Sequence, residues 1–375
     1  MAAAMMRRAV GSRSPCRFPC SWPCLRTSAV TARYRAEWLR NSRRQLPVVE
    51  RESKMTKLAR PITRDEVHTY NRAGFVLLRG VLDLQTVNRF RRSMDQAIAS
   101  LADSPAGYNV SEVTRAAEAC DFDALQSNSD GQHDLAGMVA HIKATEKPLL
   151  LDPVEGKGSF LLDTGVAARI REFRKLCLSG VLPEIAAAFL DSEAVNFFGD
   201  QIFVKEPGTR ERTAFHQDST YFNIEGDQCC VVWVPVDPAS YETGTMLYVR
   251  GIDGKAQDYQ PNTFVSHASL PGAEGAELPD IENNLDAYDV VHFDVEPGDV
   301  LVHHYKTIHG TSGNASRYQV RRAASLRYCG DDIRYRARPY APKQLHLQYE
   351  PRDGDPLGGP DFPIVWQRAP AQQAA

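Results

Sequence analysis

VVHFDVEPGDVLVHHYKTIHG, which runs from Val290 to Gly310, is the stretch of sequence that decides the fold. Its β-branched and apolar runs are separated by Pro297-Gly298-Asp299, a combination that favours a turn between two strands. Similar runs, separated by Gly, Pro and Asp, recur along the chain after Val195. They are NFFGDQIFVKEPG (196–208), QCCVVWVPVDP (228–238), GTMLYVRG (244–251) and RRAASLRYCG (321–330). This pattern predicts many short strands that close into a sandwich or barrel.

The sequence before Val195 carries helix signals instead. Thr63-Arg-Asp-Glu66 is a capping box, and the helix that it begins should end at Gly74. A strand at 75–78 should follow, and then a longer helix capped by Asp83, with apolar residues three and four apart at Leu84, Val87, Phe90, Met94 and Ile98. Two more helices are predicted over Val166–Leu178 and Leu182–Leu190. Helices followed by many short strands predict an α+β protein.

The chain divides into three parts. Up to Leu46 the first part carries many arginines and a single acid, Glu37, which is typical of an organellar transit segment. It is equally typical of an upstream stretch included by a mis-set start codon, because a domain-like sequence opens at Met55. We expect 1–54 to be a disordered leader, 55–338 the folded domain, and 339–375 a wrapping or loose tail. Within the domain, the polar stretch 103–165 predicts a long insertion near the mouth of the barrel rather than core.

The composition excludes several classes of protein. The 375 residues are 43% hydrophobic and 24% charged, as in ordinary globular proteins. No apolar run approaches the roughly 18 residues that cross a bilayer. A net charge of −3 without a dense basic stripe makes nucleic acid an unexpected partner. The eight cysteines are spaced too irregularly for a disulfide framework, so we expect reduced thiols. The predicted location is the cytoplasm, or mitochondria or peroxisomes if the leader is genuine.

The segment FHQDST (215–220) contains a possible metal site. In extended backbone, residues two apart project to the same side, so His216 and Asp218 could present an imidazole and a carboxylate to one point. A lone His-x-Asp more often makes a turn or a salt bridge, so a third ligand is needed. His309 is the best candidate, because it follows a predicted strand and precedes Gly310. Two histidines and one carboxylate leave open positions that suit non-haem Fe(II), whereas a structural zinc site is closed and usually uses thiolates.

An arginine pair lies beyond His309, in the predicted strand 320–328. Arg321 and Arg322 must point to opposite faces, so only one of them can face the interior. A guanidinium inside a barrel needs an anion, and its bidentate fork matches a carboxylate. The sequence therefore predicts an anchor for an acidic co-substrate at one of these two residues.

In combination these motifs resemble the phytanoyl-CoA dioxygenase family of Fe(II)- and 2-oxoglutarate-dependent oxygenases, over about Thr63 to Asp332. The resemblance rests on five segments: GFVLLRGVLD (74–83), HQD (216–218), CVVWVPVD (230–237), GDVLVHHYKTIHG (298–310) and RRAASLRY (321–328). It implies a double-stranded β-helix, a jelly-roll or cupin-like core, with flanking N-terminal helices.

The resemblance also implies roles for particular residues. His216, Asp218 and His309 would be the catalytic metal ligands. The arginine that binds 2-oxoglutarate maps to Arg321, with Arg322 as the alternative because the preceding loop is a residue longer.

Several other side chains have two interpretations each. Lys205 could contact 2-oxoglutarate or be a solvated edge lysine. Trp233 could line the co-substrate cleft or simply pack in the core. Tyr221 and Phe222 could line the pocket or be ordinary core aromatics. Of the adjacent pair His303 and His304 one must face inward; His304 is a candidate for the pocket wall, although a satisfied core or surface histidine is the more common case.

The activity implied by the resemblance is hydroxylation of an unactivated C–H bond in a small organic or acyl substrate. Fe(II), 2-oxoglutarate and O2 would be required, and succinate and CO2 released. Halogenase-like relatives lack the metal carboxylate, so Asp218 favours hydroxylation. Many relatives read Pro-Gly-Ser-His where this chain has 249–253, Val-Arg-Gly-Ile-Asp, which leaves the substrate open. The alternatives are a non-catalytic β-barrel protein that binds a metal and a small acid, and a cupin-type hydrolase or isomerase that uses another metal.

Overall fold

The computed structural model describes residues 57–119, 157–251, 257–267, 269–270, 273–338, 340–341 and 344–369. The predicted leader at 1–54 lies outside the described residues. The helices are α2 (Arg64–Ala73), α3 (Leu84–Ala99), α4 (Val110–Ala119), α7 (Val166–Arg169), α8 (Arg171–Leu178) and α9 (Val181–Leu190), with short 3-10 turns η1 (Leu101–Asp103), η2 (Asp218–Thr220) and η3 (Glu282–Ala287). None of the described helices combines the length and hydrophobicity needed to cross a bilayer.

Two antiparallel sheets form the centre of the molecule. The larger has the strand order β1-β10-β7-β12-β4-β3-β2, with β14 also paired to β4, and the smaller has the order β5-β11-β8-β9. A third, two-stranded sheet joins β13 and β6. The strands are β1 (Phe75–Leu78), β2 (Gly107–Asn109), β3 (Phe160–Thr164), β4 (Ala194–Lys205), β5 (Thr213–His216), β6 (Ile224–Glu225), β7 (Cys229–Pro235), β8 (Met246–Arg250), β9 (Asp289–His292), β10 (Val300–His304), β11 (His309–Thr311), β12 (Arg321–Cys329), β13 (Arg334–Tyr335) and β14 (Ile364–Gln367).

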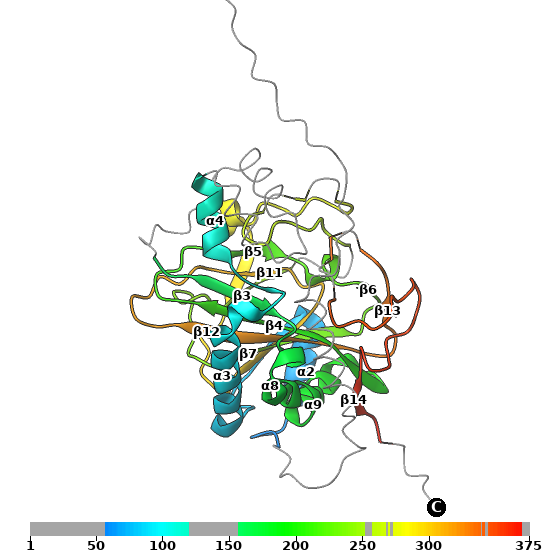
Figure 1. Ribbon diagram of the computed structural model, residues 1–375. Helices are drawn as coiled ribbons and strands as arrows, with labels where there is room; N and C mark the ends of the chain where they lie inside the picture. Colours follow the sequence, from blue (N-terminus) through cyan, green and yellow to red (C-terminus); the bar gives the residue numbers. More distant parts are fainter. Residues whose placement is uncertain are drawn as a thin grey trace, which may run out of the picture.

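The elements stack in three layers. Helices α2, α3, α8 and α9 cover one face of the larger sheet, and the smaller sheet lies on its other side (Figure 1). Helices and antiparallel strands in this order confirm the predicted α+β class. The space between the two sheets is therefore the interior of the sandwich.

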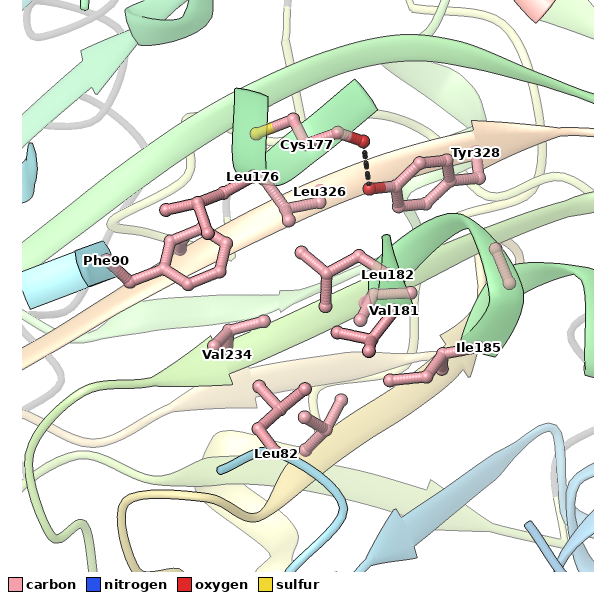
Figure 2. Packing of buried hydrophobic residues seen from close by; sticks show 14 of the residues in the cluster. Leu82, Phe90, Leu176, Cys177, Val181, Leu182, Ile185, Val234, Leu326 and Tyr328 are labelled. Atoms are coloured by element: carbon pink, nitrogen blue, oxygen red, sulfur yellow. Dashed lines mark hydrogen bonds between the residues drawn. The ribbon is translucent and has the colours of Figure 1, made fainter. Parts of the chain in front are cut away.

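Alternation along β12 separates the helix-side core from this interior. Leu326 and Tyr328 belong to the apolar cluster beneath the helices, where the Tyr328 hydroxyl donates to the Cys177 carbonyl oxygen at 2.8 Å (Figure 2). Side chains in a strand alternate between faces, so Arg321, Ser325 and Arg327 turn toward the smaller sheet. Charged residues on the inner face of a buried strand are rare unless they bind something.

The first predicted elements are confirmed. The Thr63 hydroxyl accepts from the Glu66 amide at 3.2 Å and the Glu66 carboxylate accepts from the Thr63 amide at 2.8 Å, which closes the capping box of α2. Gly74 ends the helix with φ 78°, a left-handed conformation that favours glycine. Asp83 caps α3 through a bond from the Thr86 amide at 2.6 Å.

Two helix predictions need correction. The single helix predicted over Val166–Leu178 is divided into α7 and α8, because Ile170 adopts extended backbone with φ −104° and ψ 103° and buries its side chain. In α3, Leu84 is 65% exposed although it was grouped with the apolar face. It is the first residue of the helix, and the buried residues of α3 begin only at Thr86 and Val87.

The predicted insertion and tail both contribute to the larger sheet. Strand β3, at the end of the stretch 103–165, pairs with β4, and its Phe160 and Leu162 are buried, so this part of the insertion is core and the prediction for it was wrong. Residues 120–156 lie outside the described part of the chain. In the tail, β14 pairs with β4 and Phe362 is buried, so the described tail wraps around the domain.

The cysteine prediction agrees with the structure over the described residues. Cys229 and Cys230 are adjacent in β7 and point to opposite faces, one into the cluster around Phe222 and the other into the helix-side core. Both are buried free thiols, as are Cys177 and Cys329.

Candidate metal and co-substrate site

The three predicted metal ligands meet between the sheets. His216 ends β5 and His309 begins β11, and the two residues pair directly across the ladder. Asp218 opens the 3-10 turn immediately after β5. One ligand atom from each of the three lies within 4.8 Å of the others. The His216 Nε2 is 3.6 Å from the Asp218 Oδ1, and the His309 Nε2 is 4.0 Å from the Asp218 Oδ2.

Both imidazoles are oriented by backbone carbonyls. The His216 Nδ1 lies 2.8 Å from the Ala214 oxygen, and the His309 Nδ1 lies 2.9 Å from the Thr307 oxygen. A carbonyl can only accept, so each Nδ1 carries a proton, and each Nε2 is left facing Asp218. Burial, together with the neighbouring His216 and His303, holds the pKa of His309 well below its usual value. The His309 ring is therefore neutral and can act as a metal ligand through Nε2.

The Asp218 carboxylate is the anionic member of the group. Burial acts to raise its pKa, but the His216 and His303 side chains outweigh burial and hold the pKa well below the usual range. Two imidazoles and one ionised carboxylate on one side form the donor set that suits non-haem Fe(II). The residues present thus fit the predicted metal.

Arg321 and Arg322 differ in their partners. The Arg322 guanidinium forms a bidentate pair with Asp237, at 2.7 Å for both bonds, and a further ion pair with Asp95. Arg321 is 1% exposed on the inner face, its Nε has no hydrogen-bond partner, and within the described chain it forms no ion pair. Burial lowers its pKa to about 10, so it stays charged at neutral pH. A buried guanidinium without a counter-ion can bind a carboxylate through its bidentate fork.

Lys205 and Trp233 also face the interior. Lys205 pairs with Arg321 across the ladder, is fully buried, and donates through Nζ to the Thr311 hydroxyl at 2.8 Å and the Ser312 carbonyl at 2.5 Å. The alternative of a solvated edge lysine is therefore wrong. Trp233 is 2% exposed and lies opposite Ser325, on the same face of the sheet as Arg321.

Comparison with known proteins identifies the family. Residues 70–323 match the family model described as phytanoyl-CoA dioxygenase. The chain belongs to the phytanoyl-CoA dioxygenase family. It is accordingly a 2-oxoglutarate-dependent oxygenase of iron and dioxygen, and the predicted family, fold class and enzyme class are confirmed. A comparison with curated proteins finds no match to this chain.

Solved structures share the fold of this family member. The non-heme alpha ketoglutarate dependent carbocyclase SnoK from nogalamycin biosynthesis is 20% identical, with a TM-score of 0.53 over 83% of this chain and 99% of that chain. The epimerase SnoN, crystallised with Fe3+, alpha ketoglutarate and nogalamycin RO, is 20% identical with a TM-score of 0.51, over 80% of this chain and 98% of that chain. At this identity the likeness establishes the fold alone.

His303 is a residue of the site that the sequence did not single out. Its Nδ1 lies 3.1 Å from the Tyr248 hydroxyl, and its Nε2 lies 3.7 Å from the Asp218 Oδ2 and has no hydrogen-bond partner. His304, the suggested wall residue, instead donates through Nε2 to the Asp227 carbonyl at 2.7 Å and is a satisfied core histidine. Sequence alternation shows that the two point apart, but only the pairing of β10 with β1 and β7 decides which of them faces the metal ligands.

Two aromatic rings contact the edge of His216. The Tyr221 ring centroid is 5.8 Å away, and the Tyr221 hydroxyl donates to the Asn262 carbonyl at 2.7 Å. The Phe264 centroid is 5.3 Å away, from a residue with φ 69°. Phe264 lies in a loop without periodicity, so no sequence signal pointed to it. These rings pack against the His216 imidazole edge to face.

Proposed function

We propose that His216, Asp218 and His309 bind Fe(II), and that the enzyme hydroxylates an unactivated C–H bond of a small organic or acyl substrate. The observation that carries the proposal is the convergence of three ligand atoms within 4.8 Å of one another in the same sandwich as an unpaired, buried Arg321. When bound, Fe(II) and 2-oxoglutarate supply the oxygen-activating chemistry that yields succinate and CO2.

Each residue has a defined task in this proposal. The carbonyls of Ala214 and Thr307 hold the two imidazoles so that their Nε2 atoms, with Asp218, would bind the metal. Arg321 would hold the distal carboxylate of 2-oxoglutarate. Lys205, with Nζ held by Thr311 and Ser312, supports the same anion, and Trp233 closes the apolar side of the cleft.

An anaerobic titration tests the proposal. The full chain is loaded with Fe(II) and titrated with 2-oxoglutarate while the visible absorption band of the chelate is followed. A saturable band is expected in the wild type and is expected to be absent in Asp218→Ala. Asp227→Ala removes an exposed acid nearby and should leave the band unchanged. No band in folded wild-type protein would refute the metal assignment.

Oxygen consumption distinguishes the enzyme from the non-catalytic alternative. After admission of O2, the enzyme should release succinate in step with CO2, slowly without substrate and faster with it. A protein that forms the band but releases no succinate with any substrate tested would be a binder of metal and small acid.

We also propose a cytoplasmic location and a folded domain at 55–338, with residues 1–54 as a leader that would direct the protein to mitochondria or peroxisomes if it is translated. Fluorescent fusions that begin at Met1 and at Met55 test this. Identical diffuse distributions would support the cytoplasm, and an organellar distribution of the longer fusion alone would support the leader.

A further inference from the structure

A second arginine faces the interior of the sandwich. Residues directly opposite in antiparallel strands point to the same face, and Val231 lies opposite both His303 in β10 and Arg327 in β12. His303 points at Asp218, so Arg327 projects toward the same space from two strands away. The mechanism described above makes no use of this guanidinium.

The contacts of the Arg327 guanidinium fix its position but do not neutralise its positive charge. Its Nη2 donates to the Gln201 side-chain oxygen at 2.5 Å, and its guanidinium lies 4.8 Å from the centroid of the Phe222 ring. Its Nε has no hydrogen-bond partner, and within the described chain it forms no ion pair. The residue as a whole is half-buried.

Neither nearby acid acts as its counter-ion. Asp200 lies on the opposite, helix-side face of the larger sheet, where it accepts from the Val166 and Ala167 amides at 2.7 and 3.2 Å. Asp218 lies beyond ion-pair distance and faces the histidines. Burial lowers the pKa of Arg327 and Asp218 partly offsets this, but a guanidinium remains protonated in proteins.

Arg327 and Arg321 lie at opposite ends of the site. They are six residues apart on one strand, which corresponds to about 20 Å. Arg321 pairs with Lys205, which binds Thr311 at the far end of β11, whereas Arg327 shares its row with His303 beside Asp218. A co-substrate anchored at Arg321 would therefore leave Arg327 free on the other side of the metal ligands.

With Fe(II) and 2-oxoglutarate bound in the site, the positive charge of Arg327 would still lack a counter-charge. Fe(II) and the two carboxylates of 2-oxoglutarate offset each other, as do Asp218 and Arg321. The Lys205 Nζ is already held by Thr311 and Ser312, at the Arg321 end of the site. We propose that Arg327 binds a carboxylate of the substrate. The proposal rests on the proposed function and narrows it to substrates that carry an acid group at one end and an apolar C–H near the metal.

Calorimetry on the anaerobic complex of the full chain with Fe(II) and saturating 2-oxoglutarate tests this. The probes are hexanoate, 1-hexanol and hexylamine, matched in chain length, and 2-oxoglutarate occupies Arg321 throughout. Hexanoate should bind at least about tenfold more tightly than the alcohol or the amine, because a charge-assisted bidentate contact is worth more than a neutral one. Hexanoate should also increase the rate of succinate release when O2 is admitted.

Three variants give the test its controls. Arg327→Gln should lose about tenfold or more of the hexanoate affinity, and Arg327→Lys should keep part of it. Arg322→Gln, on the outer face of the same strand, should bind hexanoate as the wild type does. Unchanged affinity in Arg327→Gln, or no preference for the acid in the wild type, would overturn the proposal. If the visible Fe(II) and 2-oxoglutarate band is absent from the wild type, the proposed function itself fails; if the band forms without a preference for hexanoate, only the role of Arg327 fails.

Discussion

His303 and Tyr248 form a second layer of contacts behind the Asp218 carboxylate. The Tyr248 hydroxyl, which burial keeps protonated by raising its pKa, can donate to the His303 Nδ1, so that the proton of the neutral ring stays on Nε2 and faces the Asp218 Oδ2. An N–H that faces one carboxylate oxygen at 3.7 Å favours the present orientation of the carboxylate, and such outer contacts typically change metal affinity by about 10- to 100-fold.

The first prediction is therefore that His303→Phe weakens Fe(II) binding by about tenfold while the protein stays folded. The phenylalanine fills the same space but presents no N–H to Asp218. The affinity is measured anaerobically by calorimetry. Tyr248→Phe should produce a smaller loss in the same direction, because it frees the tautomer without removing the ring. Equal Fe(II) affinity in His303→Phe and the wild type would mean that His303 only fills space.

Arg321→Ala should raise the dissociation constant of 2-oxoglutarate by about 10- to 100-fold, since a hydrogen bond to a charged group contributes about 1.5–3 kcal/mol. Its unfolding free energy should not fall greatly, because the lost Nε has no hydrogen-bond partner and the guanidinium no ion pair among the described residues. Arg322→Ala should show the reverse, because Arg322 pairs with Asp237 and Asp95. Its unfolding free energy should fall, and its affinity for 2-oxoglutarate should be unchanged. If Arg322→Ala alone weakens 2-oxoglutarate binding, the assignment of the anchor is wrong.

What the sequence could predict at this scale depends on the distance over which each signal acts. His216 and Asp218 could be paired because they are two residues apart in extended backbone, and His309 because a glycine and a strand flank it. The choice between His303 and His304 depends on a register set by Phe75 and Val231, which are remote in sequence. Alternation in a single sequence shows that His303 and His304 lie on opposite faces of the strand, but it does not show which face is turned toward the metal ligands.

At the scale of elements, the close approach of β5 and β11 brings the two histidines together. A Cβ added at Gly310 would lie 2.8 Å from the Thr213 carbonyl oxygen and 3.2 Å from the Phe215 amide nitrogen. Both atoms are backbone, so they cannot rotate away. The glycine that follows His309 is thus required for the pairing of His309 with His216, which gives the His-Gly pair in the sequence a physical reason.

Gly310→Ala should therefore weaken Fe(II) binding by about tenfold and lower the unfolding free energy by about 1–3 kcal/mol, the usual cost of forcing extra volume into a packed site. Fe(II) calorimetry and chemical denaturation measure the two effects. Gly199→Ala is the matched control, because Gly199 also lies within a strand but an added Cβ there would meet no atom within 4 Å. Similar losses in both variants would show that the effect is not specific to the contact of β5 with β11.

The predicted elements were most accurate where the signal was local. The capping box, Gly74 and the Asp83 cap each act within a few residues, and α2 and α3 begin where these signals lie. The break at Ile170 was missed because a helix pattern continues through it, while tertiary packing draws the Ile170 side chain into the core. Strand β3 was missed because it is short and has no partner close in sequence.

At the scale of the whole molecule, the tail reaches the interior through a chain of rings. Phe362 stacks on Phe198 with centroids 5.7 Å apart, Phe198 contacts Phe222 at 5.5 Å, and Phe222 lies under Arg327. The Asn196 side chain also donates to the Phe362 carbonyl at 2.7 Å. Residues that composition indicated as a tail thus support the end of the site that lies farthest from Arg321.

Phe362→Ala should lower the unfolding free energy by about 3–5 kcal/mol, as for other fully buried phenylalanines. Because this row of aromatic rings ends at Arg327, the variant should also bind hexanoate more weakly. The Fe(II) and 2-oxoglutarate band should persist at low temperature, because Arg321 and the metal ligands do not belong to the row of rings. Denaturation and the anaerobic titrations measure these effects on one protein. Ile364→Ala, on the same tail but 53% exposed, is the control and should change neither property. Loss of the band together with hexanoate binding would mean that the tail stabilises the whole sandwich uniformly, rather than the substrate end of the site.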